Sequence, residues 1–177
     1  MKAYRFLVCL MLLIFPTGAF ASDNLCEIRQ LQEYGNSHFS LGVFLENADT
    51  LAGFQIPVSF DFGETVISCD SISFTGGRCQ DFEFLDSKID NQVKVAYLMG
   101  ISEASTGGSF EPLYPGSGEI ARLYFTYSGT PGEDQRIKLN RSVWKLGNNK
   151  LDYSFWTPDA VEVRCRFKVD NIRLSGQ

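Results

Sequence analysis

Apolar and polar side chains alternate along much of this chain, and this period of two limits the folds it can adopt. Phe39, Leu41, Val43 and Leu45 fall on one side of a predicted strand. The spacing of three to four residues that marks an amphipathic helix is almost absent. Three further apolar faces are predicted in the same way: Phe54, Ile56, Val58 and Phe60; Val93, Val95, Tyr97 and Met99; and Ala121, Leu123, Phe125 and Tyr127. The sequence therefore predicts an all-β chain.

Turn residues divide the alternating segments into short strands. The predicted strands are 39–45, 54–60, 66–74, 80–85, 92–99, 119–128, 136–140, 150–156 and 161–169. Roughly eight or nine strands, without an internal repeat or a low-complexity linker, are typical of a single β-sandwich with jelly-roll or Greek-key connections. A closed barrel is the alternative.

Two segments stand out from this pattern. Pro57 lies inside a predicted strand, and because proline lacks a backbone N–H we expect that strand at a sheet edge or the proline at a bulge. Residues 102–118 are rich in glycine and proline and do not alternate, which predicts a long loop. Long loops in compact domains often carry function, so this loop is a candidate contact surface.

The first 21 residues have the features of an export signal. Lys2 and Arg5 precede the apolar run 6–15, and Ala21 ends a small-residue motif. The run is shorter than the roughly 20 residues that a membrane-spanning helix needs. We expect cleavage between Ala21 and Ser22, one domain over 22–177, no membrane insertion afterwards, and a periplasmic, cell-surface or extracellular location.

Cysteine usage fits an oxidising compartment. Outside the signal lie Cys26, Cys69, Cys79 and Cys165, an even number with three possible pairings. Cys69 and Cys79 are close in sequence and the other two lie near opposite ends, so we predict the pairs Cys69–Cys79 and Cys26–Cys165. A zinc site is the competing interpretation, but the four cysteines lack the spacing of known zinc motifs.

The charge balance limits the classes of partner that the chain is expected to bind. The chain has 16 basic and 21 acidic residues, a net charge of −5, and loss of the signal would remove two of the basic ones. Nucleic acids and anionic membrane surfaces bind clustered lysine and arginine, so we expect neither as a partner. No cofactor motif is present.

Catalytic residues are scarce. His38 is the single histidine, and no nucleophile motif accompanies it. The carboxylate pairs Asp81 and Glu83, or Asp86 and Asp90, could serve as acid and base on a glycosidic bond. A secreted glycoside hydrolase is therefore the least favoured of the functions considered, and the chain is predicted not to be an enzyme.

Two acidic turns are possible calcium sites. Asp86, Asp90 and Asn91 form one, and residues 147–152 the other. Neither has EF-hand spacing, and ordinary turn chemistry accounts for both. We therefore predict no metal site.

Aromatic residues provide the candidates for a ligand site, because rings exposed on a flat sandwich face can stack on sugars. Alternation along 153–156 requires that some of these rings point into the core. The candidates are Trp144, Trp156, Tyr153, Tyr124 and Tyr114.

Three segments, taken in order, resemble a known family. They are 40–47 (SLGVFLEN), 51–61 (LAGFQIPVSFD) and 118–125 (GEIARLYF). In these phrases the chain resembles the cohesin-like domains of exported bacterial proteins, over about 39–169. The resemblance implies a jelly-roll sandwich related to some cellulose-binding modules and a non-catalytic binding surface. A protein–protein interaction module is thus the first functional hypothesis, and a carbohydrate-binding module the alternative.

Overall fold

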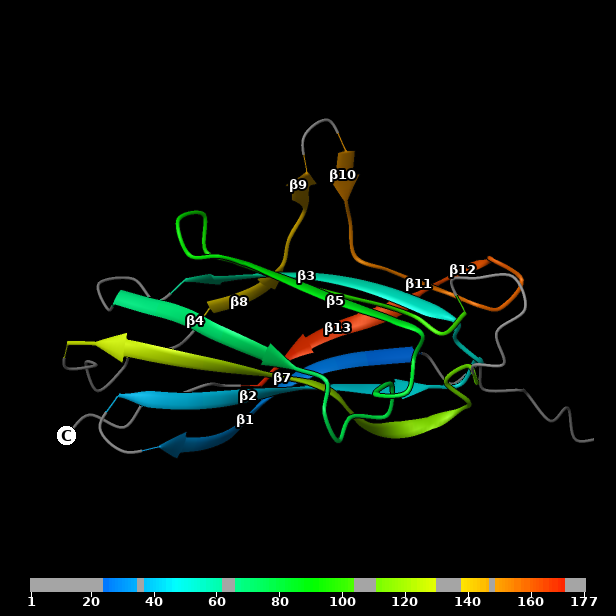
Figure 1. Ribbon diagram of the computed structural model, residues 1–177, viewed down its shortest axis with the longest axis horizontal. Helices are drawn as coiled ribbons and strands as arrows, with labels where there is room; N and C mark the ends of the chain where they lie inside the picture. Colours follow the sequence, from blue (N-terminus) through cyan, green and yellow to red (C-terminus); the bar gives the residue numbers. More distant parts are fainter. Residues whose placement is uncertain are drawn as a thin grey trace, which may run out of the picture.

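The computed structural model describes residues 24–34, 37–61, 66–103, 111–129, 138–146 and 149–170. The regular secondary structure in these residues consists of β-strands alone, and the strands build two layers packed face to face (Figure 1). The all-β sandwich predicted from the alternation is confirmed. The predicted signal and its cleavage site lie outside the described residues.

One layer is a five-stranded sheet with the order β13-β1-β2-β7-β4. Its neighbours are antiparallel except β1 and β13, which run parallel and so bring the two ends of the described chain side by side. The strands are β1 (Asn24–Tyr34), β2 (His38–Asn47), β4 (Val66–Ser73), β7 (Gly116–Ser128) and β13 (Cys165–Val169).

The other layer is a six-stranded sheet with the order β12-β11-β3-β6-β5, in which β8 also pairs with β3. A hairpin of β9 (Trp144–Leu146) and β10 (Asn149–Leu151) leaves this layer between β8 and β11 and projects from the sandwich (Figure 1). The remaining strands are β3 (Gly53–Asp61), β5 (Phe84–Asp90), β6 (Val95–Ile101), β8 (Lys138–Arg141), β11 (Ser154–Trp156) and β12 (Glu162–Val163).

The predicted strand number was too low, because the described residues contain thirteen strand segments. The predicted strand 150–156 is divided between the hairpin and β11. The predicted closing strand 161–169 is divided at Arg164, where the chain crosses from β12 in one sheet to β13 in the other.

The prediction for Pro57 was also wrong, since β3 lies inside its sheet. On one side β3 pairs with β6 along its length, and on the other it pairs first with β11 and then with β8. Pro57 lies where β11 and β8 leave a gap, and its carbonyl accepts a hydrogen bond from the Ser142 N–H at 2.8 Å. Backbone N–H and C=O of one strand residue point to the same side. The missing N–H of proline therefore faces the gap and costs no ladder bond.

The core lies between the layers, and aromatic rings fill its centre. Phe125 of β7 stacks on Phe39 of β2 with ring centroids 5.0 Å apart, and meets Phe60 of β3 edge-on at 5.3 Å. Three of the four predicted apolar faces, on β2, β3 and β7, are buried in this core as expected.

The fourth predicted face, on β6, was assigned to the wrong side. Ala96 and Leu98 lie in the core, whereas Val95 and Tyr97 point to the outside of the sheet and Val93 is 63% exposed in the preceding turn. Every residue of β6 is uncharged, so alternation cannot identify its core side. The strand predicted at 80–85 is likewise displaced, because the chain turns over 78–81 and β5 begins at Phe84.

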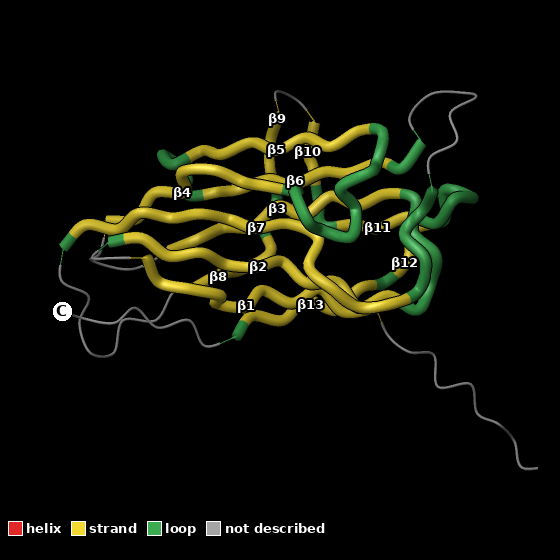
Figure 2. The backbone as a smooth tube through the Cα atoms, turned by 60° about the horizontal axis from the view of Figure 1, so that its bottom comes forward, coloured by secondary structure: helices red, strands yellow, loops and turns green. Residues whose placement is uncertain are grey.

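The sandwich has two lateral sides where strands of different layers approach, β4 with β5 and β8 with β13 (Figure 2). On the first, the Asn91 side chain accepts from the Cys69 N–H at 2.8 Å and donates to the Cys69 carbonyl at 3.0 Å. The Asn91 side chain thus hydrogen-bonds to the backbone of the edge strand β4 at its bulge. These backbone groups are then less available for pairing with a strand of another chain.

Candidate interaction surface

The outer face of the six-stranded sheet carries a continuous apolar row across four strands. The register places Trp156 of β11 opposite Gly53 of β3, Gly53 opposite Ile101 of β6, and Ile101 opposite Phe84 of β5. The Trp156 ring lies over Gly53, where a Cβ atom would come within 3.1 Å of it. Phe84 is 38% exposed, and Ile101 and Trp156 are half-buried. We call these four residues the apolar row.

A hydrogen-bonded row lies next to it. The Tyr97 hydroxyl donates to Gln55 Oε1 at 3.3 Å, and Gln55 Nε2 donates to Ser154 Oγ at 2.8 Å. Burial, and secondarily the charge of Asp86, raises the pKa of Tyr97, so the hydroxyl remains a donor. These bonds satisfy the polar groups of the inner strands and fix their side chains along the sheet.

Charged groups on this face are confined to its margins. Neither β3 from Gly53 to Ser59 nor β6 contains a charged residue, while the edge strand β5 contributes Asp86, Lys88 and Asp90. An uncharged centre with a charged rim is the usual composition of a protein–protein interface. This face therefore has the chemistry of a contact surface.

The outer face of the five-stranded sheet is different because it carries ion pairs beside the apolar side chains of Leu31 and Phe44. Glu27 of β1 pairs with both Arg29 and Lys168, and Arg122 of β7 donates two hydrogen bonds to Glu119 at 2.8 and 2.9 Å. Charged groups satisfied within their own sheet offer little to a partner.

Glu27 gives this face a testable pH dependence. The hydrogen bond from Lys168 is the largest of the effects that hold the pKa of this carboxyl below its usual range, and the hydrogen bond from Arg29 is a further one. Burial acts in the opposite direction. A lowered folded-state pKa contributes stability above the unfolded pKa of about 4.3 and loses it as the pH falls. We expect Glu27→Gln to lower the free energy of unfolding at pH 7 but not near pH 2, as measured by urea unfolding at both pH values. An equal loss at both would show that the effect is packing rather than charge.

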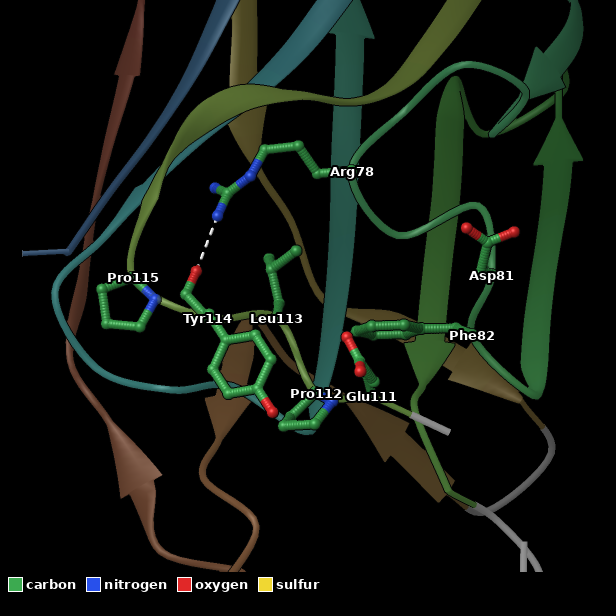
Figure 3. Close-up of a pocket in the computed structure, with 8 residues that line it drawn as sticks. All are labelled: Arg78, Asp81, Phe82, Glu111, Pro112, Leu113, Tyr114 and Pro115. Atoms are coloured by element: carbon green, nitrogen blue, oxygen red, sulfur yellow. Dashed lines mark hydrogen bonds between the residues drawn. The ribbon is translucent and has the colours of Figure 1, made fainter. Parts of the chain in front are cut away.

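A hollow of about 730 Å³ lies at one end of the sandwich (Figure 3). The Arg78 guanidinium lines it but is occupied by four acceptors: the carbonyls of Leu45, Tyr114 and Gly116, and the Asn47 side chain. Arg78 is therefore a structural brace. The other lining residues are Asp81, Phe82, Glu111, Pro112, Leu113, Tyr114 and Pro115.

The predicted loop 102–118 contributes part of this hollow. Leu113 pairs with Leu51 through two backbone hydrogen bonds of 2.8 and 3.0 Å, and β7 already begins at Gly116. The loop is thus shorter than predicted at its end, and residues 104–110 lie outside the described chain.

The predicted aromatic residues do not meet on one surface. Trp156 lies on the outer face of the six-stranded sheet, Tyr124 half-buried on that of the other sheet, and Tyr114, 56% exposed, in the end hollow. Tyr153 is 8% exposed and packs edge-on against Phe155 and Phe167, so its ring anchors the core. Trp144 belongs to β9, and its side chain lies outside the description. The predicted residues did not include Phe84 and Ile101, because their position in one row with Trp156 depends on strand register.

The four cysteines in the described residues are free thiols, and only one predicted pair lies close together. Cys69 is opposite Phe125 of β7, whereas the Cys79 sulfur contacts the Ile120 carbonyl, five residues away along β7. At about 3.3 Å per residue this separation is roughly 16 Å, far beyond the limit of about 7 Å between bridged Cα atoms. The Cys69–Cys79 pairing is therefore not supported.

Cys26 and Cys165, by contrast, lie on the neighbouring strands β1 and β13 and both pack in or against the core, although they are offset by two residues: Cys26 is opposite Phe167, and Cys165 is opposite Asn24. The Tyr153 hydroxyl donates to the Arg166 carbonyl at 3.3 Å and lies near both thiols. Burial raises the pKa of the Cys165 thiol to about 11 and that of Cys26 further.

The described ranges contain no group of three or more His, Cys, Asp or Glu side chains able to hold an ion. At the first turn weighed for calcium, Asp90 Oδ1 accepts from the N–H groups of Gln92 and Val93, as turn chemistry predicts. The described chain also has no helix of the length and hydropathy needed to cross a membrane.

The sheet orders described above define the class of fold, that of cohesin domains. The sixth cohesin of Acetivibrio cellulolyticus scaffoldin B, solved with a Cel5 dockerin, matches with a TM-score of 0.60 and 11% identity over 85% of this chain and 96% of that one. The Clostridium thermocellum OlpA cohesin, solved with a dockerin, has a TM-score of 0.60 and 12% identity over 85% and 99%. A non-cellulosomal cohesin of Archaeoglobus fulgidus has a TM-score of 0.55 and 10% identity over 85% and 93%.

No family model and no curated protein sequence matches the chain. At such low identity the structural matches show the fold, and they confirm the cohesin-like sandwich that the three sequence segments indicate.

Proposed function

We propose that this protein is an exported, non-catalytic module that binds another protein through the outer face of the six-stranded sheet. The observation that carries the proposal is the apolar row within an uncharged centre, bordered by the charges of β5. The opposite sheet carries internal ion pairs at Glu27 and Glu119 on its outer face. Two of the fold neighbours were solved with a dockerin bound, which supports a protein as the partner class.

A charge placed in the apolar row tests the proposal. We expect Ile101→Lys to abolish capture of a secreted partner protein, because a lysine ammonium in the middle of a closed apolar interface would lose its hydration. Residues 22–177 immobilised on a resin would be exposed to the secreted proteins of the source organism, and captured bands identified by mass spectrometry.

Val66→Lys is the matched control. Val66 is an exposed β-branched residue, 62% accessible, on β4 of the other sheet, so this variant adds the same charge away from the apolar row. Loss of capture in both variants, or in neither, would contradict the assignment to this face.

Carbohydrate binding is the second candidate, favoured by Trp156. Its ring lies over Gly53 and remains half-exposed, so part of it is accessible for stacking on a sugar ring. Retention of the domain on insoluble polysaccharides, lost in Trp156→Ala, would support this candidate. Glycan retention without protein capture would replace the first proposal.

A further inference from the structure

On the lateral side where β8 approaches β13, the sandwich has a basic cleft of about 680 Å³. Arg141 of β8, Arg164 between β12 and β13, and Arg166 of β13 line it, and Glu162 is the acidic residue in its lining. An adjoining hollow shares Arg141 and Glu162 and adds Asp152. Positive charge gathers here although the whole chain carries −5.

Two of these guanidinium groups form no ion pair with any residue that the structure describes. Arg141 is held over the Tyr153 ring, with its central carbon 5.9 Å from the ring centroid, and Arg164 is exposed. Elsewhere Arg29 and Arg122 pair with glutamates and Arg78 with carbonyls. Unpaired guanidinium groups from two elements at one cleft are suited to carboxylates, which they bind through two parallel hydrogen bonds.

The cleft also borders a strand edge. In the described chain β13 pairs only with β1, and β8 only with β3. The Asp170 N–H donates to the Ile28 carbonyl, so backbone groups of alternate residues, including Cys165 and Phe167, point away from β1. An extended peptide can add to such an edge through backbone hydrogen bonds.

The same cleft is poorly suited to a sugar. Arg141 covers a face of Tyr153, Phe155 and Phe167 pack against its edges, and Phe155 is fully buried. Tyr153, which is 8% exposed, and Phe155 therefore offer no open ring face for stacking. We propose that this basic cleft is a second binding site, separate from the apolar row, and that it binds an extended peptide segment rich in aspartate or glutamate.

The test uses a capped octapeptide of alternating glutamate and threonine, and the same peptide with glutamine in place of glutamate. We expect the glutamate peptide to bind the mature protein, and Arg164→Gln and Arg141→Gln each to weaken binding by about tenfold or more, because each removes one charge-assisted pair. Lys145→Gln, on the projecting hairpin, is the control for net charge, and Ile101→Lys should bind the peptide normally. Thermal unfolding checks the fold of each variant.

Equal binding of the glutamine peptide, or an equal loss in Lys145→Gln, would overturn the proposal. Tri-galacturonate binding that depends on Arg164 while the peptide fails to bind would assign the cleft to an acidic glycan instead. A dimer in sedimentation velocity that Arg164→Gln dissociates, with no peptide binding, would assign it to a second copy of the chain.

Discussion

Replacing Arg78 with methionine is expected to lower the free energy of unfolding by about 3 kcal/mol, although part of the side chain lies at the surface. Its guanidinium donates to the Leu45 carbonyl at 3.0 Å and to Asn47 Oδ1 at 2.8 Å, both partly buried. Water can replace the guanidinium at the two exposed carbonyls, those of Tyr114 and Gly116, but has less access to the inner pair. Each buried acceptor left without a donor costs about 1–3 kcal/mol.

Arg78→Lys should recover only part of this loss, because an ammonium group lacks the planar fork that reaches separate acceptors. Arg122→Met is the matched control, since it removes a two-bond pair with Glu119 at the surface and should cost about 1 kcal/mol or less. Urea unfolding of the three variants measures these differences. Equal losses at Arg78 and Arg122 would refute the bracing role.

The contribution of Arg78 shows where sequence reasoning stops. Alternation predicted the core sides of β2, β3 and β7 because mainly polar or small residues separate their core-facing ones. It failed for β6, where Val95, Ala96, Tyr97 and Leu98 follow one another and only the packing of two layers selects a side. Arg78 has no periodic signal either, since its acceptors come from 45–47 and 114–116.

The candidate surface was predictable only in part, for a related reason. Trp156 was identified as a candidate by its residue type, but its neighbours in the apolar row are set by register. Ile101 and Phe84 are far from it in sequence and meet it only when β11, β3, β6 and β5 align. Arg141 and Arg164 of the basic cleft were missed because overall acidity concealed a local positive charge.

The second large effect concerns the cysteines: the oxidised protein is expected to contain a Cys26–Cys165 disulfide that stabilises it by about 5 kcal/mol on the loop-entropy model. The expected stabilisation is large because the disulfide would join β1 to β13 and close a loop through nearly the whole described chain. The Tyr153 hydroxyl already lies against both thiols. Burial raises the pKa of both, so few thiolates form in the folded state and we expect the bond to form during folding.

Peptide mapping under non-reducing conditions and guanidinium unfolding test this prediction together. Cys165→Ser should remove the stabilisation under oxidising conditions and have little effect in reducing buffer, since the half-buried Cys165 tolerates a hydroxyl better than the fully buried Cys26. A Cys69–Cys79 peptide would show that the roughly 16 Å separating these residues along β7 closes in the oxidised protein, and would restore the pairing expected from sequence proximity. If Cys165→Ser were equally stable in both buffers, the parallel pairing of β1 and β13, not a covalent bond, would hold the two ends of the domain together.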